Sequence, residues 1–145
     1  MKSVKVFSPA TIGNVGPGFD ILGMAIKNMG DTIEARQIPG DQIIIEDILN
    51  ADHDISSDPE KNTAGIAARE AMNLMGISQG VSLVISKGMP SGSGLGSSAA
   101  SAAAGACTVN ILFENKLSRD ELLQAAMAGE YSVSGGYFAD NVAPA

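Results

Sequence analysis

Residues 87–102 read KGMPSGSGLGSSAASA, a glycine- and serine-rich segment between two apolar runs. The run before it, residues 81–86, predicts a strand, and the alanine-rich run after it, which extends to Cys107, predicts a helix. A turn of this kind leaves free backbone N–H groups at the helix N-terminus, where the helix dipole favours an anion. The segment therefore predicts a phosphate-binding loop.

Two common phosphate-binding loops fit this segment poorly. A Walker A loop ends in Gly-Lys-Ser or Gly-Lys-Thr, and no lysine follows Gly96. The pattern Gly94-x-Gly96-x-x-Ala99 matches a dinucleotide-binding loop, but that loop also needs a second parallel strand ending in an acidic residue about 20 residues on. Residues 110–124 show a helical pattern instead, which argues against a dinucleotide site. An ordinary glycine-rich turn before a buried helix remains the alternative without a ligand.

The composition is that of a folded domain. The 145 residues are 45% hydrophobic and 17% charged, which suits one domain with a core of its own. No apolar run approaches the ~18 residues that span a bilayer, so no membrane association is expected. The N-terminus lacks a signal-peptide core and Cys107 is the only cysteine, which favours the cytoplasm. The net charge of −7 argues against nucleic acid as a partner.

The pattern along the chain mixes strands and helices. Strands are expected over residues 3–8, 31–38, 42–48 and 81–86. Pro9 is expected to end the first strand. The second and third strands are expected to pair as a hairpin. A shaped loop is expected over residues 10–20. Helices are expected from Asn62 or Thr63 to Gly76, from Ser97 or Ser98 to about Phe113, and from a capping box at Ser118 to near Tyr131.

The run Pro90-x-Gly92-x-Gly94-Leu95-Gly96-Ser97-Ser98-Ala99 resembles the ATP loop of the GHMP small-molecule kinases, the superfamily of galactokinase, homoserine kinase, mevalonate kinase and phosphomevalonate kinase. Other segments are similar to the homoserine kinases in particular. These are residues 9–20 with Gly23, residues 58–62, and Glu130 with Ser134-Gly135 and residues 139–144. The match covers the whole chain in order. Homoserine kinases are longer, so residues 1–145 are expected to be the N-terminal, ATP-binding domain of a truncated protein whose C-terminal domain is absent.

The resemblance implies an α+β fold, a two-layer α/β sandwich with the left-handed β-α-β unit of GHMP kinase N-terminal domains. Such a unit departs from the usual right-handed crossover, and the sequence pattern alone does not predict it. The reaction implied is that of a homoserine kinase, an ATP-dependent phosphotransferase that converts L-homoserine to O-phospho-L-homoserine in threonine biosynthesis. ATP and Mg²⁺ are the implied cofactors, L-homoserine is the implied substrate, and a homodimer is possible by analogy.

Two other functions stay open. The chain is similar to kinases of several small alcohols, and another alcohol is therefore an alternative acceptor. A nucleotide-binding fragment without catalysis is the second alternative, because the isolated 145-residue chain is expected to be inactive.

The resemblance also assigns roles to single positions. Ser98 and Glu130 match the metal-binding pair, with Glu130 and Asp140 as the catalytic carboxylates and Asp140 expected to orient the acceptor hydroxyl or take its proton. Asn14, Asp20 and Asn141 are expected to contact the acceptor. The nucleotide is expected to contact Asn62, Lys87, Pro90, Ser91, Gly92, Ser93, Gly94, Leu95, Gly96, Ser97, Ser98, Ala99 and Ala100.

Plain structural roles compete with some of these assignments. Lys87 and Glu130 can be solvated charges, and Asp20 and Asp140 can cap loops through Asx-turns. The chain also departs from the family at Phe138, where homoserine kinases usually carry histidine. Phenylalanine cannot donate a hydrogen bond, so it cannot take over a proton or hydrogen-bonding role of that histidine.

Overall fold

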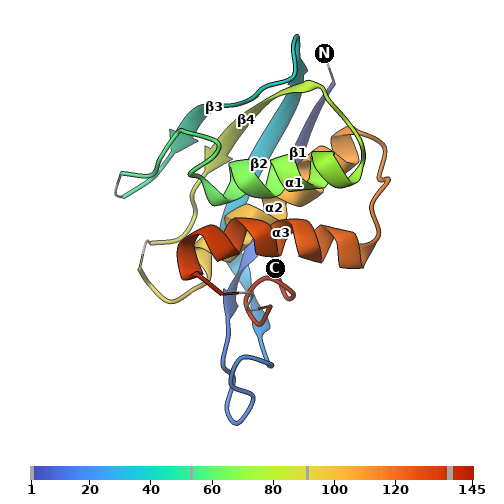
Figure 1. The fold of residues 1–145 in the computed structure, drawn as a ribbon. Helices are drawn as coiled ribbons and strands as arrows, with labels where there is room; N and C mark the ends of the chain where they lie inside the picture. Colours follow the sequence, from blue (N-terminus) through green and yellow to red (C-terminus); the bar gives the residue numbers. More distant parts are fainter. Residues whose placement is uncertain (1, 53, 91, 137–138) are drawn as a thin grey trace.

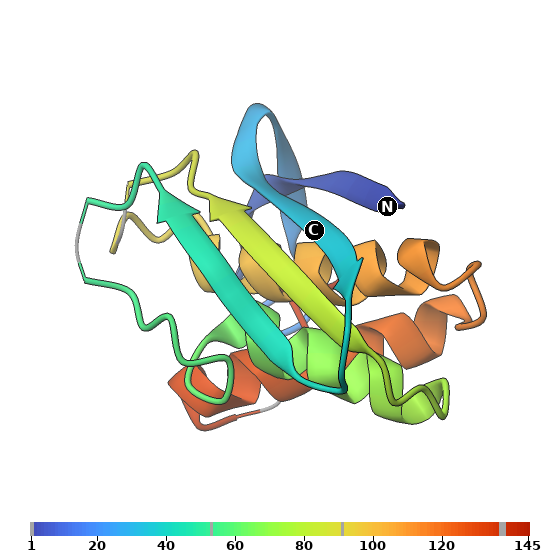
Figure 2. The same ribbon diagram turned by 90° about the horizontal axis from the view of Figure 1, so that it is seen from above.

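The computed structural model describes residues 2–52, 54–90, 92–136 and 139–145. Three helices lie on one face of a four-stranded sheet, in two layers that Figure 2 shows from above. The elements in chain order are β1 (Ser3–Ile12), β2 (Met24–Ile38), β3 (Ile43–Leu49), α1 (Thr63–Leu74), β4 (Gly80–Ser86), α2 (Ser97–Leu112) and α3 (Arg119–Ser134). This arrangement confirms the expected α+β sandwich.

The strand order of the sheet is β1-β2-β4-β3. β2 pairs antiparallel with β1 and β4, whereas β3 pairs parallel with β4. The predicted hairpin between residues 31–38 and 42–48 is therefore wrong, although these strands follow each other closely in the chain. β4 is buried along most of its length, and its backbone groups need partners on both edges. Its insertion between β2 and β3 supplies both ladders.

The parallel strands β3 and β4 are connected through α1, which lies on the helix-covered face of the sheet. In Figure 1 both strands point downward, α1 lies in front of the sheet, and β4 lies to the right of β3. The crossover is therefore left-handed, as the resemblance implies and contrary to the usual preference.

The first strand is longer than the sequence indicates. Pro9 was expected to end it, but β1 continues to Ile12 and pairs with β2 along its whole length. Proline is tolerated because β1 is an edge strand and the register shifts between Pro9 and Ala10, as at a β-bulge. The extension carries Thr11, the second residue of the expected loop, into the sheet.

The central helix α2 is buried almost all round. Twelve of its sixteen residues are buried, so it packs on β1 and β2 and also on both other helices. Small side chains permit this packing: a Cβ on Gly105 would lie only 2.6 Å from the carbonyl oxygen of Ala64 in α1. The position of α2 is thus fixed by the sheet and by both other helices.

The three predicted helices are confirmed, and α3 extends to Ser134, beyond its predicted end near Tyr131. Asn62 caps α1 through its side chain, and Ser118 forms the predicted capping box with Glu121 at the start of α3. In the described part of the chain, no helix is long and apolar enough to cross a lipid bilayer.

Candidate active site

The glycine-rich loop, residues 90–96, connects β4 to α2. Gly92, Gly94 and Gly96 have φ angles of 66°, 72° and 65°, which side chains with a Cβ rarely adopt. Gly96 is also the N-cap of α2 and has no side chain that could occupy the first N–H groups of the helix. The loop therefore presents the positive end of the α2 dipole, an arrangement suited to an anion.

A pocket of about 390 Å³ lies against this loop. It brings together most of the residues expected to contact the nucleotide: Asn62, Lys87, Gly92, Ser93, Gly94, Leu95, Gly96, Ser97 and Ser98. The pocket is also lined by residues that were not among the expected nucleotide contacts, namely Ile55, Lys61, Thr63, Ile85, Ser101 and Val133.

Three of the expected nucleotide contacts do not line the pocket. Ala99 and Ala100 are fully buried, whereas Pro90 is exposed. The two alanines belong to the hydrophobic core. Ser91 lies outside the described residues.

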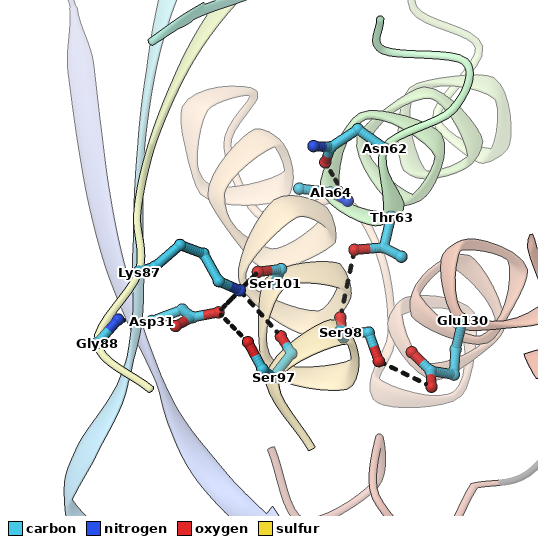
Figure 3. A network of polar contacts seen from close by, with 10 residues as sticks. All are labelled: Asp31, Asn62, Thr63, Ala64, Lys87, Gly88, Ser97, Ser98, Ser101 and Glu130. Atoms are coloured by element: carbon cyan, nitrogen blue, oxygen red, sulfur yellow. Dashed lines mark hydrogen bonds and ion pairs between the residues drawn. The ribbon is translucent and has the colours of Figure 1, made fainter. Parts of the chain in front are cut away.

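Asn62 shapes the edge of the pocket rather than projecting freely into it. Its Oδ1 accepts a hydrogen bond of 3.0 Å from the backbone N–H of Ala64, and its Nδ2 donates to the carbonyl oxygen of Ser56 at 2.9 Å (Figure 3 shows the first of these). Both ends of the amide are thus engaged, and Asn62 holds the start of α1 in place.

Lys87 lies in a buried polar network beside the first turns of α2 (Figure 3). Its ammonium donates to Asp31 Oδ2, to Ser101 Oγ at 2.8 Å and to the carbonyl oxygen of Ser97 at 3.3 Å. Lysine has three N–H donors, and these three contacts use them all. The alternative of a solvated charge at a strand end is therefore wrong for Lys87.

Asp31 is the counter-charge in this network, and sequence reasoning missed it. Its side chain is fully buried and accepts hydrogen bonds from the N–H of Gly88 at 3.0 Å and from Ser101 Oγ at 2.7 Å. It therefore connects β2, the end of β4 and the first turns of α2. A single aspartate at the start of a strand pattern carries no local signal for this role.

Ser98 and Glu130 meet as the resemblance implies. Ser98 in the first turn of α2 donates to Glu130 Oε1 in α3 at 3.0 Å (Figure 3). Burial, together with the nearby negative charge of Asp140, raises the pKa of Glu130, and the hydrogen bond from Ser98 only partly offsets this. Glu130 is thus not a solvated surface glutamate. A hydroxyl beside a carboxylate forms a set of hard oxygen ligands of the kind that Mg²⁺ takes.

A second polar cluster joins the end of β1 to the C-terminal segment. Thr11 Oγ1 donates to Asn141 Oδ1 at 3.1 Å, and the N–H of Asn14 donates to Asp140 Oδ2 at 3.1 Å. A Cβ on Gly13 would lie 2.1 Å from Asp140 Oδ2 and 2.6 Å from Asn141 Nδ2, so a larger residue at this position would force these side chains to shift. The structure therefore brings together three expected residues, Asn14, Asp140 and Asn141, and adds Thr11.

Asp20 has a different place. It is exposed, and its backbone N–H donates to Asn14 Oδ1 at 2.8 Å. This contact holds the loop that carries Asn14, and the part of Asp20 that makes it is the backbone and not the carboxylate. Phe138 lies outside the described residues.

These contacts can be compared with known proteins. Residues 62–145, more than half of the chain, match the GHMP kinases N terminal domain. The chain belongs to the GHMP kinase family. The matched range contains the glycine-rich loop, Lys87, Glu130, Asp140 and Asn141.

The relatives of this GHMP kinase chain include homoserine kinases. One from Arabidopsis thaliana is 50% identical over 99% of this chain and 40% of its own length, and one from Methanococcus maripaludis is 43% identical over 100% of this chain and 48% of its own. The crystal structure of a homoserine kinase from Cytophaga hutchinsonii has a TM-score of 0.93 and 46% identity, covering 99% of this chain and 46% of that one. The chain spans about half the length of these relatives or less.

The raised pKa of Glu130 predicts a pH effect on the stability of this GHMP kinase chain. Because the folded state holds the proton more tightly than the unfolded state, the ionisation of Glu130 destabilises the fold as pH rises from about 4, the ordinary glutamate value, through the higher pKa of the folded state. The side chain in Glu130→Gln is neutral at every pH, so the variant does not lose this stability as pH rises.

Urea unfolding of the wild type and of Glu130→Gln at several values between pH 4 and pH 7 measures the effect. The wild type is expected to lose stability relative to the variant as pH rises. Other carboxyl groups also make stability depend on pH, such as Glu121, whose pKa is lowered by hydrogen bonds from Ser118. Because these groups are present in both proteins, their contributions cancel in the difference between wild type and variant. A difference that stays constant with pH contradicts the burial assigned to Glu130.

Proposed function

We propose that the complete gene product is a homoserine kinase that transfers the γ-phosphoryl group of ATP to the side-chain hydroxyl of L-homoserine. The observation that carries this proposal is the contact between the glycine-rich loop and the second polar cluster. A Cβ on Gly96 would lie 2.2 Å from Thr11 Oγ1 and 3.1 Å from Asn141 Oδ1. A site for phosphate and a site for a small polar acceptor therefore adjoin, as phosphoryl transfer requires. The names of the relatives support homoserine as the acceptor.

ATP fits the pocket beside the glycine-rich loop. The N–H groups at the start of α2 would hold its phosphates, and Ser98 with Glu130 would bind Mg²⁺ together with phosphate oxygens. The metal, when bound, neutralises negative charge on the phosphates. The ammonium of Lys87 has its donors engaged by protein groups, so its contribution to ATP binding is to support the loop and not to contact a phosphate.

The second polar cluster fits a small zwitterionic alcohol. In the reaction the acceptor hydroxyl oxygen forms a bond to the γ-phosphorus, and the bond from that phosphorus to the bridging oxygen of ADP breaks. The hydroxyl proton passes by way of the Asp140 carboxylate to water. Asp140 Oδ2 accepts from Asn14 and is an oxygen that can orient the hydroxyl proton. Asn14 and Asn141 supply polar groups for the amino acid part of the acceptor, and Asp20, on the exposed loop beside Asn14, is a further proposed contact. Positioning and charge therefore matter more here than strong basicity.

ADP release from ATP and Mg²⁺ tests the proposal, with L-homoserine, mevalonate, galactose or no acceptor. We expect release that depends on L-homoserine. Release with another alcohol alone identifies a GHMP kinase of different specificity and contradicts the proposal. ATP binding without release on any acceptor favours a nucleotide-binding module without catalysis.

We also propose that residues 1–145 are the ATP-binding domain and that turnover needs further chain. The lengths of the relatives support this division, because the chain matches 40% and 48% of two of them. The same assay on residues 1–145 and on the complete gene product tests it. Equal turnover by both contradicts the division.

A further inference from the structure

Thr11 lies where the glycine-rich loop meets the second polar cluster. It is completely buried near the end of β1. Its backbone N–H donates to the carbonyl oxygen of Leu95 in the loop at 2.9 Å, and its hydroxyl donates to Asn141 Oδ1 at 3.1 Å. One residue therefore touches both parts of the site, the loop through its main chain and the cluster through its side chain.

The hydroxyl of Thr11 is held tightly between its neighbours. A Cβ on Gly96 would lie only 2.2 Å from Thr11 Oγ1 and 3.1 Å from Asn141 Oδ1. The loop backbone at Gly96 therefore packs directly on the hydrogen bond between Thr11 and Asn141. The Thr11 hydroxyl therefore has little freedom to turn away from Asn141.

This contact sets the orientation of the Asn141 amide. With Oδ1 turned toward the Thr11 hydroxyl, Nδ2 lies on the opposite side, near Gly13. Asp140 Oδ2 lies close to the same position. A Cβ on Gly13 would lie 2.1 Å from Asp140 Oδ2 and 2.6 Å from Asn141 Nδ2. A hydrogen-bond donor and an acceptor thus lie side by side in the second polar cluster, to which the proposed function assigns the small alcohol.

We propose that Thr11 is a positioning residue for the acceptor, which acts by fixing the Asn141 amide. The inference rests on the proposed function. The two hydrogen bonds of Thr11 can be changed separately. Loss of the hydroxyl frees the Asn141 amide, whereas the hydrogen bond from the Thr11 backbone N–H to Leu95 does not depend on the side chain. Loss of the hydroxyl should therefore weaken use of the acceptor and leave use of ATP nearly unchanged.

Thr11→Val and Thr11→Ser form a matched pair for the test, made in the complete gene product. Valine keeps the shape of threonine and removes the hydroxyl, whereas serine keeps the hydroxyl and removes the methyl group. We expect Thr11→Val to lower kcat/KM for L-homoserine about tenfold, the order of one lost hydrogen bond, with the KM for ATP changed less than about twofold. Thr11→Ser should keep most of the kcat/KM for L-homoserine.

A second variant tests whether Thr11 acts through Asn141. In an Asn141→Ala background, Thr11→Val should cause little further loss, because the amide that it positions is gone. Equal losses from valine and serine at Thr11, or a KM for ATP that rises as much as the KM for L-homoserine, overturn the inference. Independent losses in the double variant also overturn it.

A spectroscopic measurement keeps the inference separate from the proposed function. The side-chain amide signal of Asn141 in an NMR spectrum should shift in Thr11→Val and stay near its wild-type position in Thr11→Ser, with or without turnover. Wild-type protein that does not phosphorylate L-homoserine contradicts the proposed function alone. An Asn141 signal that does not respond to Thr11→Val contradicts the positioning role alone.

Discussion

Asp31→Asn is expected to lower the free energy of unfolding by about 3–5 kcal/mol, because it leaves a buried ammonium without its counter-charge. The side chain of Asp31 is fully buried and that of Lys87 is 6% exposed, so water cannot take the place of the lost carboxylate. The variant also weakens the contacts that Asp31 makes with Gly88 and Ser101. The midpoint of urea unfolding and its slope measure the loss.

The chain offers a matched control for Asp31→Asn in an exposed ion pair. Lys61 and Asp58 lie 3.1 Å apart, with side chains 74% and 42% exposed, and Asp58→Asn should have a much smaller effect. Asp31→Asn combined with Lys87→Met should be more stable than Asp31→Asn alone, because no buried charge then remains unpaired. Equal midpoints for Asp31→Asn and Asp58→Asn contradict the role assigned to the buried pair.

Ser98→Ala and Glu130→Gln are each expected to reduce turnover about 100-fold, the order seen when one group that stabilises transition-state charge is removed. Both residues line the proposed metal position, where Ser98 donates to Glu130 across the gap between α2 and α3. Loss of the Ser98 hydroxyl or of the negative charge of Glu130 should also raise the Mg²⁺ concentration that gives half-maximal ADP release. Steady-state assays over a range of Mg²⁺ concentrations measure both effects.

Two substitutions on neighbouring helices serve as controls for the metal position. Ser132→Ala removes a hydroxyl from α3 that donates to the carbonyl oxygen of Gly129 within the same helix. Glu70→Gln removes a carboxylate from α1 that pairs locally with Asn73. Neither should change the Mg²⁺ dependence. If Ser98→Ala and Glu130→Gln leave that dependence unchanged as well, the metal assignment is wrong.

Glu130→Gln should affect stability and turnover in opposite directions near neutral pH. The raised pKa of Glu130 shows that burial of its charge is unfavourable in the folded state, so the neutral side chain relieves this burden while it removes a proposed ligand. A variant that is no less stable and yet turns over slowly would separate a functional carboxylate from a structural one.

The sequence by itself determined the features that depend on neighbours along the chain. The glycines at positions 92, 94 and 96 permit backbone angles that a side chain would disfavour, and all three have positive φ. The capping signals at Asn62 and Ser118 set the starts of α1 and α3. Each of these features is formed within a few residues, so local stereochemistry decides it.

Strand pairing needed the tertiary structure. Residues 31–38 and 42–48 resemble a hairpin because they are close in the chain and rich in β-branched residues. In the structure both segments pair with β4, which lies between them. The left-handed crossover through α1 likewise follows from how helices and sheet pack, and no local pattern encodes it.

The candidate site divides in the same way. The glycine-rich loop and the acidic residues Glu130 and Asp140 could be named from motifs, but Asp31 and Thr11 could not. Asp31 meets Lys87 across 56 positions of the chain, and Thr11 meets Asn141 across 130. A single buried aspartate or threonine has no signature in its own segment. Its partners come together only when the sheet, α2 and the C-terminal segment pack, because burial then forces each polar group to find a partner.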